Sequence, residues 1–258
     1  MKFLKRIYPQ VIYYSRTRNR ILKNKFGLIV LMYHAIHEGS VSTLYPYSIS
    51  VNSFEEQIQY LKEVAEFIDP NNLVDFRKNN VRRSKLNILL TFDDGYKNNY
   101  SLAFPLLRKC QIPGIIFLTT DFIGRDYTTF LNWSEVKEME KSGLITFGSH
   151  CCRHFNLTAL DKEDAILEMK NSKIELEKKL GQAVKFLSYP GGGHNREIMN
   201  FAEECGYEAS FKDRMHSDRQ NNKLHAIGRL SVEQTNEDLY KFIATLAVVK
   251  PIQNIVRS

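Results

Sequence analysis

The chain has 258 residues, of which 43% are hydrophobic and 25% charged, and its formal net charge is +7. This composition is close to that of an average folded globular protein and excludes intrinsic disorder and collagen-like repeats. The longest apolar runs are about six or seven residues, whereas a membrane-crossing helix needs about twenty, so the sequence predicts no transmembrane helix.

The first 26 residues carry the net positive charge. They contain eight basic side chains and no acidic one, and the rest of the chain has 28 basic and 29 acidic residues. No apolar stretch of about 7–15 residues follows the charged start, as a signal peptide would require. We therefore expect residues 1–26 to form a basic arm and residues 27–258 to form one folded domain.

The basic arm is expected to meet an anionic partner such as a membrane surface. Leu4, Ile7, Val11 and Tyr14 have helical spacing with basic residues between them, as in a helix that lies on a membrane. Pro9 interrupts this pattern, and a solvated basic tail is the alternative. Because the body of the chain is not basic, specific binding of nucleic acid is not expected.

Short apolar runs alternate with helical patterns along the rest of the chain. The first predicted helix begins at Ser53, which forms a capping box with Glu56, and its apolar face extends as far as Ile68. Further helices are predicted over residues 97–109, after 134, over 161–180, over 195–205 and around 239–246. The predicted strands cover residues 27–34, 86–92, 114–120, 144–149, 186–189, 209–211 and 227–232.

Continuous apolar strands that alternate with helices are typical of a parallel sheet covered by helices. Six to seven such units in about 230 residues favour an α/β fold, a distorted (β/α) barrel of about seven parallel strands, over an open sheet. In such barrels the chemistry gathers at the carboxyl ends of the strands. Polar clusters at those ends are therefore the candidate functional residues.

Polar or glycine-rich groups do follow four of the predicted strands. His34 ends the first strand, Asp93 and Asp94 end the second, His150 ends the fourth, and a glycine-rich segment that begins at Tyr189 ends the fifth. Because these ends meet at one edge of a parallel barrel, we expect the groups to lie close together.

Asp93 and Asp94 are adjacent carboxylates, which repel each other unless a positive group neutralises one of them. A metal ion would do this, and an Asp-Gly turn in a loop is the alternative. His150 and His154 have the spacing i, i+4, which would place both imidazoles on one face of a helical turn, as in known zinc sites. Two imidazoles and one carboxylate leave positions open for water and substrate, so they predict a catalytic metal site.

The four cysteines contain no CxxC pair. Cys151 and Cys152 are adjacent, so a bridge between them would be strained, and both are expected to pack away from the histidines that flank them. These features favour a reducing compartment. We expect a cytoplasmic protein that the basic arm holds peripherally at the inner membrane face.

The motifs resemble a known family. TFDDG at 91–95, SHxxxH at 149–154 and YPGG at 189–192, in this order and on these strands, look like the polysaccharide deacetylases, which form carbohydrate esterase family four and contain the nodulation-type deacetylase domain. The resemblance covers residues 27–235. The opening LMYH at 31–34 is similar to members that deacetylate poly-N-acetylglucosamine.

The resemblance implies roles for the matching residues. Asp94, His150 and His154 would hold a divalent metal, with zinc as the default and cobalt, manganese or iron as alternatives. Asp93 would be the general base. The backbone N–H of Tyr189 would stabilise the oxyanion.

The sequence departs from the family pattern in two places. The late Leu-x-His motif, which supplies the general acid in many members, has no clear match. His34 is therefore the expected general acid, as in members that share the Tyr-His opening, with His194 and His225 as alternatives. The arginine of the third motif is also missing, and Arg229 is expected to supply that cation to Asp93 from another strand.

These residues predict a metal-dependent hydrolase that removes an N-acetyl group from an amino sugar, in a glycan or a lipid-linked sugar precursor, and releases acetate. Two alternatives stay open. The same groups could hydrolyse a formyl group or another amide, or the chain could be a carbohydrate-binding protein without turnover. The complete set of Asp93, Asp94, His150 and His154 argues against the last.

Overall fold

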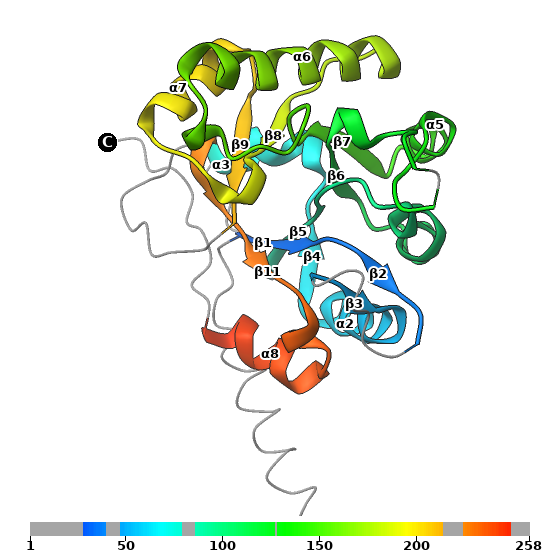
Figure 1. Ribbon diagram of the computed structural model, residues 1–258. Coiled ribbons are helices and arrows are strands. Elements are labelled where there is room, and N and C mark those ends of the chain that lie inside the picture. Colours follow the sequence, from blue (N-terminus) through cyan, green and yellow to red (C-terminus); the bar gives the residue numbers. More distant parts are fainter. Residues whose placement is uncertain (1–27, 40–46, 79–85, 127, 214–223, 249–258) are drawn as a thin grey trace, which may run out of the picture.

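A computed structural model describes residues 28–39, 47–78, 86–126, 128–213 and 224–248 (Figure 1). The predicted basic arm, residues 1–26, lies outside the described residues. The strands are β1 (Leu28–Tyr33), β2 (Ile36–His37), β3 (Ile49–Ser50), β4 (Ala65–Phe67), β5 (Leu86–Phe92), β6 (Gly114–Leu118), β7 (Ile145–Ser149), β8 (Phe186–Ser188), β9 (Ala209–Lys212), β10 (Ile227–Gly228) and β11 (Leu230–Ser231). The helices are α2 (Val51–Val64), α3 (Leu73–Lys78), α4 (Phe104–Cys110), α5 (Trp133–Lys141), α6 (Lys162–Leu180), α7 (Arg196–Glu204) and α8 (Leu239–Val248).

The main sheet is parallel and follows the order β10-β9-β8-β7-β6-β5-β1-β11, with β4 added beside β5. The two ends of this order, β10 and β11, are neighbours in the chain and are separated only by Arg229. Residues 227–231 thus pair with β9 on one side and with β1 on the other, which closes the sheet into a barrel. The prediction of a distorted barrel of about seven parallel strands is confirmed.

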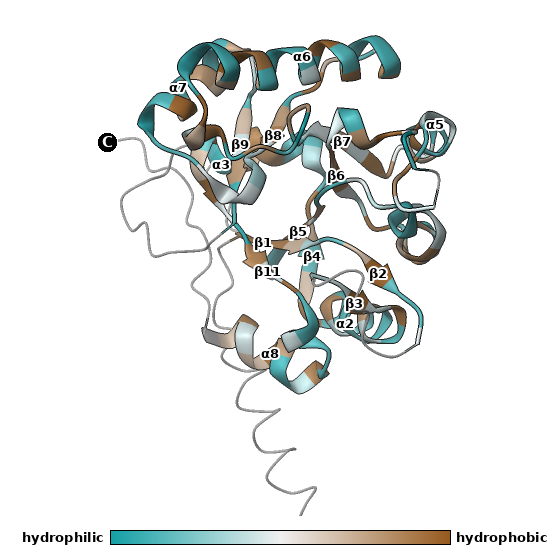
Figure 2. Cartoon of the chain, in the orientation of Figure 1, coloured by the Kyte–Doolittle hydropathy of each residue, from teal (hydrophilic) through white to brown (hydrophobic). Residues whose placement is uncertain are grey.

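Side-chain alternation along each strand separates two apolar clusters. The inner cluster contains, among others, Leu28, Val30, Leu89, Phe117 and Phe211, and it fills the barrel. Leu73 and Phe76 of α3 belong to the same cluster. The outer faces of the strands pack against the helices, which lie around the barrel (Figure 1). Many residues of α6 are hydrophilic (Figure 2).

The same alternation continues into the residues that follow the strands. Along and beyond β1, the residues at alternate positions after the inner Val30 are Met32 and His34. Along and beyond β5, Thr91 and Asp93 follow the inner Leu89 in the same way, and beyond β9 Asp213 follows the inner Phe211. The apolar members fill one end of the barrel, and the polar members therefore gather at the carboxyl end. This geometry brings together residues that are far apart in the sequence.

Two predicted boundaries are wrong. Helix α2 begins at Val51, because Ser50 rather than Ser53 caps it by accepting the N–H of Ser53 at 3.2 Å. It ends at Val64, so that the next residues form β4 instead of continuing the apolar face to Ile68. Pairing with β5 replaces helical bonds here, a tertiary effect that helical periodicity does not reveal.

No helix among the described residues combines the length and the apolar character that a membrane span requires.

Candidate metal and catalytic site

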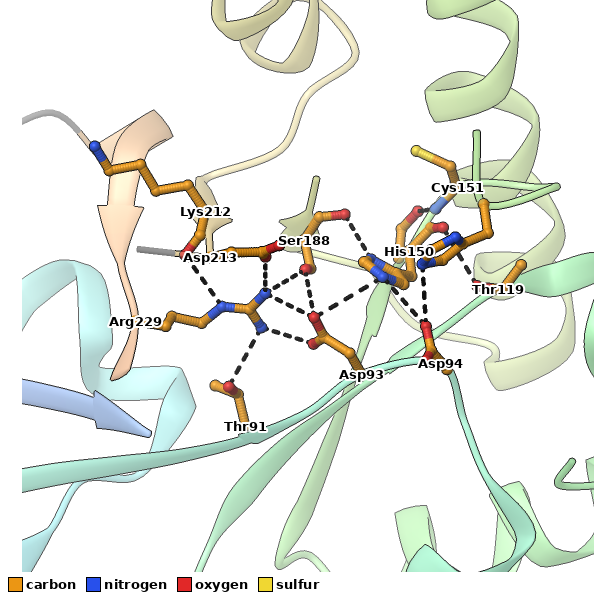
Figure 3. Close-up of polar contacts among 12 residues, drawn as sticks. Thr91, Asp93, Asp94, Thr119, His150, Cys151, Ser188, Lys212, Asp213 and Arg229 are labelled. Atoms are coloured by element: carbon orange, nitrogen blue, oxygen red, sulfur yellow. Dashed lines mark hydrogen bonds and ion pairs between the residues drawn. The ribbon is translucent and has the colours of Figure 1, made fainter. Parts of the chain in front are cut away.

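Asp94 owes its position to the end of β5. Alternation would send adjacent carboxylates to opposite faces of the sheet, but the backbone of Asp94 turns into the left-handed region with a φ of 71°. Gly95 follows with a φ of 74°. This turn directs the Asp94 carboxylate toward His150, with Oδ1 at 3.4 Å from His150 Nε2 (Figure 3). Asp94 Oδ1 also lies 3.2 Å from His154 Nε2.

The segment from His150 to His154 is not the helical turn that the i, i+4 spacing predicted. Cys151 and His154 have φ values of 64° and 62°, and the segment is an irregular loop. The two imidazole rings nevertheless meet, with centroids 4.8 Å apart. Cys151 is fully buried in the outer core, which agrees with the predicted packing role.

The three predicted ligands fit a divalent metal. Asp94 Oδ1 is buried and has no hydrogen-bond partner among the described residues, although it faces two imidazole nitrogens. His150 Nδ1 lies 2.8 Å from the Ser188 carbonyl, and donation of its N–H there leaves a lone pair on Nε2. Ligand atoms of Asp94, His150 and His154 lie within 4.8 Å of one another. A carboxylate oxygen and two imidazole nitrogens form a donor set typical of catalytic zinc.

Asp93 is held by Arg229 in a fully buried ion pair. Arg229 Nη1 and Nη2 donate to Asp93 Oδ1 and Oδ2, each at 2.6 Å (Figure 3). Ser188 Oγ donates to Asp93 Oδ2 at 3.1 Å and accepts from Arg229 Nη2 at 2.8 Å. On its other side, Arg229 Nη2 contacts Asp213 Oδ1 at 3.2 Å. Arg229 therefore lies where the sequence analysis expected a cation for Asp93.

These contacts set the charge states of the site. Burial alone would raise the pKa of Asp93, but the charges of Arg229 and His150 and the Arg229 hydrogen bonds outweigh burial and lower it. Burial likewise opposes ionisation of Asp94, yet His150 and His154 hold the pKa of Asp94 well below its usual value. Asp93 is thus a carboxylate at neutral pH, as a proton acceptor must be.

His34 lies beside Asp93. Its strand neighbour Tyr33 pairs with Phe92, and the Tyr33 carbonyl accepts the Asp93 N–H at 3.0 Å. The charge of His34 contributes to the lowered pKa of Asp93 and of Asp94. Its Nδ1 atom is buried and has no hydrogen-bond partner among the described residues.

The backbone at Tyr189 does not serve the predicted role. Its N–H donates to the Phe211 carbonyl at 3.0 Å, as strand pairing between β8 and β9 requires, so it is not free for an oxyanion. In the turn that follows, Gly192 and Gly193 donate to the carbonyls of Tyr189 and Pro190. Pro190 has no N–H, so the backbone N–H of Gly191 is the donor of this turn that neither of these bonds uses.

The two alternative general acids point elsewhere. His194 Nδ1 bonds to the Gly192 carbonyl at 2.8 Å, and its ring stacks on Tyr189 with centroids 5.7 Å apart. His225 Nδ1 bonds to Ser210 Oγ at 3.2 Å, and Ser210 lies on the outer face of β9, between the inner residues Ala209 and Phe211. Of the three candidate general acids, His34 is therefore the one that lies beside Asp93, where His150 Nε2 also lies 3.8 Å from Asp93 Oδ2.

The chain also matches known proteins. A family model described as polysaccharide deacetylase matches residues 80–210, which include Asp93, Asp94, His150 and His154. The chain belongs to the polysaccharide deacetylase family. The family resemblance predicted from the motifs is confirmed.

Three similar proteins illustrate this membership. YxkH of Bacillus subtilis is 28% identical over 206 residues, which are 80% of this chain and 71% of YxkH. The poly-beta-1,6-N-acetyl-D-glucosamine N-deacetylase of Staphylococcus aureus is 28% identical over 64% of this chain, and the match spans only 61% of that enzyme. The structure of the Streptococcus pyogenes deacetylase PplD in complex with acetate has a TM-score of 0.75 and 25% identity, and the match covers 87% of this chain and 99% of PplD.

Sequence reasoning missed several residues of this polysaccharide deacetylase. Asn99 is buried, and its Nδ2 donates to the His34 carbonyl at 2.7 Å. Ser188 and Asp213 were not singled out, although both lie at inner positions of strand ends and contact Arg229. Their position two residues beyond inner apolar residues was the available signal.

Removal of the Arg229 charge should destabilise the fold strongly. We expect Arg229→Met to lower the free energy of unfolding at pH 7 by about 3–5 kcal/mol, because Asp93 would remain buried without its partner. The paired Asp93 has a folded pKa below the unfolded value of 3.8, so the pair stabilises the protein above about pH 4 and loses this effect as the pH falls further. In the variant, burial would raise the pKa of Asp93, so the deficit should shrink between pH 7 and pH 5 in urea titrations.

Two further variants control this experiment. Adding Asp93→Asn to Arg229→Met should recover part of the loss, because the uncompensated charge is gone. Lys185→Met breaks the exposed pair of Lys185 with Glu208, 3.5 Å apart, and should cost less than about 1 kcal/mol. A deficit for Arg229→Met as small as that of Lys185→Met would contradict the importance of the buried pair.

Proposed function

We propose that this chain is a metal-dependent hydrolase that removes N-acetyl groups from amino sugars of a glycan and releases acetate. The observation that carries the proposal is the pairing of two carboxylates with different surroundings at one strand end. Asp94 faces two imidazoles, whereas Asp93 is held by Arg229 and Ser188. One carboxylate is thus arranged to bind a cation, and the other to accept a proton.

Asp94, His150 and His154 would hold the divalent cation, with zinc favoured by the donor set and cobalt, manganese and iron as alternatives. When bound, such a cation lowers the pKa of water and polarises an amide carbonyl. Asp93 takes the proton of the attacking water as its oxygen bonds to the carbonyl carbon. The Gly191 N–H is the candidate donor to the carbonyl oxygen as this atom gains negative charge.

His34 would complete the reaction. As the C–N bond breaks, the leaving nitrogen needs a proton to depart as a neutral amine, and a protonated His34 supplies it. Asn99 holds the His34 backbone, and the ring of Tyr47 lies 5.4 Å from the His34 ring, centroid to centroid. The products are acetate and the free amino sugar.

The comparisons support the amino-sugar substrate. The Staphylococcus aureus relative is named for poly-beta-1,6-N-acetyl-D-glucosamine, and PplD is a deacetylase with acetate bound. Hydrolysis of a formyl group or of another amide would use the same residues, so the substrate panel must include both.

Acetate release tests the proposal directly. The chain, freed of metal with a chelator and then given Zn²⁺ or Co²⁺, should release acetate from oligomers of N-acetylglucosamine only after metal is added. Asp94→Asn should lose most metal binding and activity together, because an amide oxygen is a weaker ligand than a carboxylate. Formyl release without acetate release would favour the alternative amide hydrolase, and bound metal without turnover of any acylated sugar would favour a binding protein.

Replacement of His34 should separate proton donation from metal binding. We expect His34→Gln to lower kcat by about 10²–10⁴-fold while Zn²⁺ affinity is retained. His194→Gln is the matched control and should keep most of the activity, because that ring bonds within its own turn. Equal losses for the two variants would remove His34 from the role of general acid.

We further propose that the basic arm binds the protein to anionic lipid, at the cytoplasmic face of the membrane, where a lipid-linked glycan would be presented. The eight basic residues of positions 1–26, with no acidic residue among them, support this proposal. Deletion of residues 1–24 should abolish sedimentation with vesicles that contain phosphatidylserine and leave hydrolysis of a soluble oligosaccharide unchanged. Equal sedimentation of the full-length and shortened proteins would contradict it.

A further inference from the structure

The loop between the two histidine ligands has an unusual backbone. Cys151 and His154 both have left-handed φ values, which are strained for residues other than glycine. In this loop, which is not a helical turn, His150 Nε2 and His154 Nε2 both lie close to Asp94 Oδ1. Contacts outside the loop must therefore hold it.

The carbonyl side of this loop is bound by the turn that follows β6. Thr120 and Asp121 donate their N–H groups to the carbonyls of Cys151 and Cys152, at 3.2 and 3.0 Å. These bonds fix one edge of the loop and leave the N–H groups on the other edge in need of acceptors.

A single carboxylate from helix α6 satisfies that other edge. Glu168 Oε2 accepts the N–H of Cys152 at 3.0 Å and the N–H of Arg153 at 2.9 Å. Glu168 Oε1 accepts from Arg153 Nε at 2.5 Å. Only 2% of the Glu168 surface is exposed. Successive backbone N–H groups beside a left-handed residue form an anion-binding concavity, and here the anion is a side chain of the protein itself.

Helix packing does not account for this residue. Glu168 lies on the buried face of α6, with Ala165, Met169, Ser172 and Leu176, where an apolar side chain would pack without any loss of solvation. Replacing a buried ion pair by apolar residues is often neutral or stabilising, so a buried carboxylate is weak grounds for a role in stability. Its bonds go instead to the backbone between two ligands.

We propose that Glu168 is a positioning residue that preorganises His150 and His154 for the metal by anchoring the backbone between them. The inference rests on the proposed function, since it concerns the same metal site. Glu168 does not touch the reacting atoms; it acts through the loop. Without the Glu168 carboxylate, the side chains of Asp94, His150 and His154 are still present, but the loop can adopt other conformations. Metal binding must then order the loop, and the free energy of this ordering lowers the metal affinity.

Metal affinity is the decisive measurement. The Zn²⁺ dissociation constant, obtained by competition with a chelator, should be about tenfold or more weaker in Glu168→Gln, because a neutral amide oxygen is a poorer acceptor for two N–H groups. Glu168→Ala should be weaker still. The visible spectrum of the Co²⁺ form should change in Glu168→Gln, because this spectrum reports ligand geometry.

Two variants control for indirect effects. Glu163→Gln removes an exposed carboxylate from the same helix and should leave the affinity within about twofold of the wild type, well below the tenfold effect expected at Glu168. Arg153→Ala removes the guanidinium from Glu168 but keeps both backbone bonds, so it should retain most of the affinity. A loss in Arg153→Ala as large as that in Glu168→Gln would assign the effect to the ion pair and overturn the proposal.

The outcomes separate this inference from the function itself. Wild-type affinity and an unchanged Co²⁺ spectrum in folded Glu168→Gln, even with a lowered melting temperature, would show a purely structural role and overturn the inference while deacetylation stands. Failure of the wild type to bind Zn²⁺ or Co²⁺ would overturn both. If Glu168→Gln does not fold, amide hydrogen exchange of the metal-free wild type decides. Slow exchange at Cys152 and Arg153 supports the anchor, and exchange at the rate of an open loop overturns it.

Discussion

The buried pair of Asp93 and Arg229 is the interaction on which the rest of the site depends. It joins β5 to the strand that closes the barrel, and it holds a carboxylate in the ionised state in a place where burial would otherwise favour the protonated form. Ser188 and Asp213 complete the surroundings of the guanidinium, so four strand ends contribute to one hydrogen-bonded group. The position and the charge of Asp93, the proposed proton acceptor, are therefore set by the closure of the fold.

Backbone strain is concentrated at Asp94 and in the loop that carries His150 and His154. Four non-glycine residues among those described have positive φ values, and three of them, Asp94, Cys151 and His154, belong to the proposed metal ligands or the loop between them. Strained residues persist where surrounding contacts overdetermine them, and they gather at functional sites. Here those contacts come from the turn after β6 and from Glu168 of α6. The two histidines lie on a loop that tertiary contacts hold in place, whereas Asp93 and Arg229 are positioned by the strands of the barrel.

Much of this could be predicted from the sequence. Apolar runs with polar ends revealed the strands, and the barrel rule then placed His34, Asp93 and His150 at one end. The i, i+4 spacing predicted that the two imidazoles meet, and they do, but through an irregular loop and not through a helical turn. The oxyanion donor was assigned to Tyr189 without regard for the hydrogen bond that strand pairing takes from its N–H. Glu168 escaped notice because helical periodicity treats a charge on an apolar face as an exception rather than as a ligand for backbone groups.

The segment that closes the barrel has a consequence for the folding of the protein. Segment 227–231 is the last piece of the ring to be synthesised, and Arg229 reaches Asp93 only when that segment docks between β9 and β1. Before docking, the Asp93 carboxyl group lacks the guanidinium that holds it ionised. A nascent or nicked chain without this segment would thus lack the proposed proton acceptor in its charged form, even with Asp94, His150 and His154 in place. Formation of the proposed site coincides with completion of the fold.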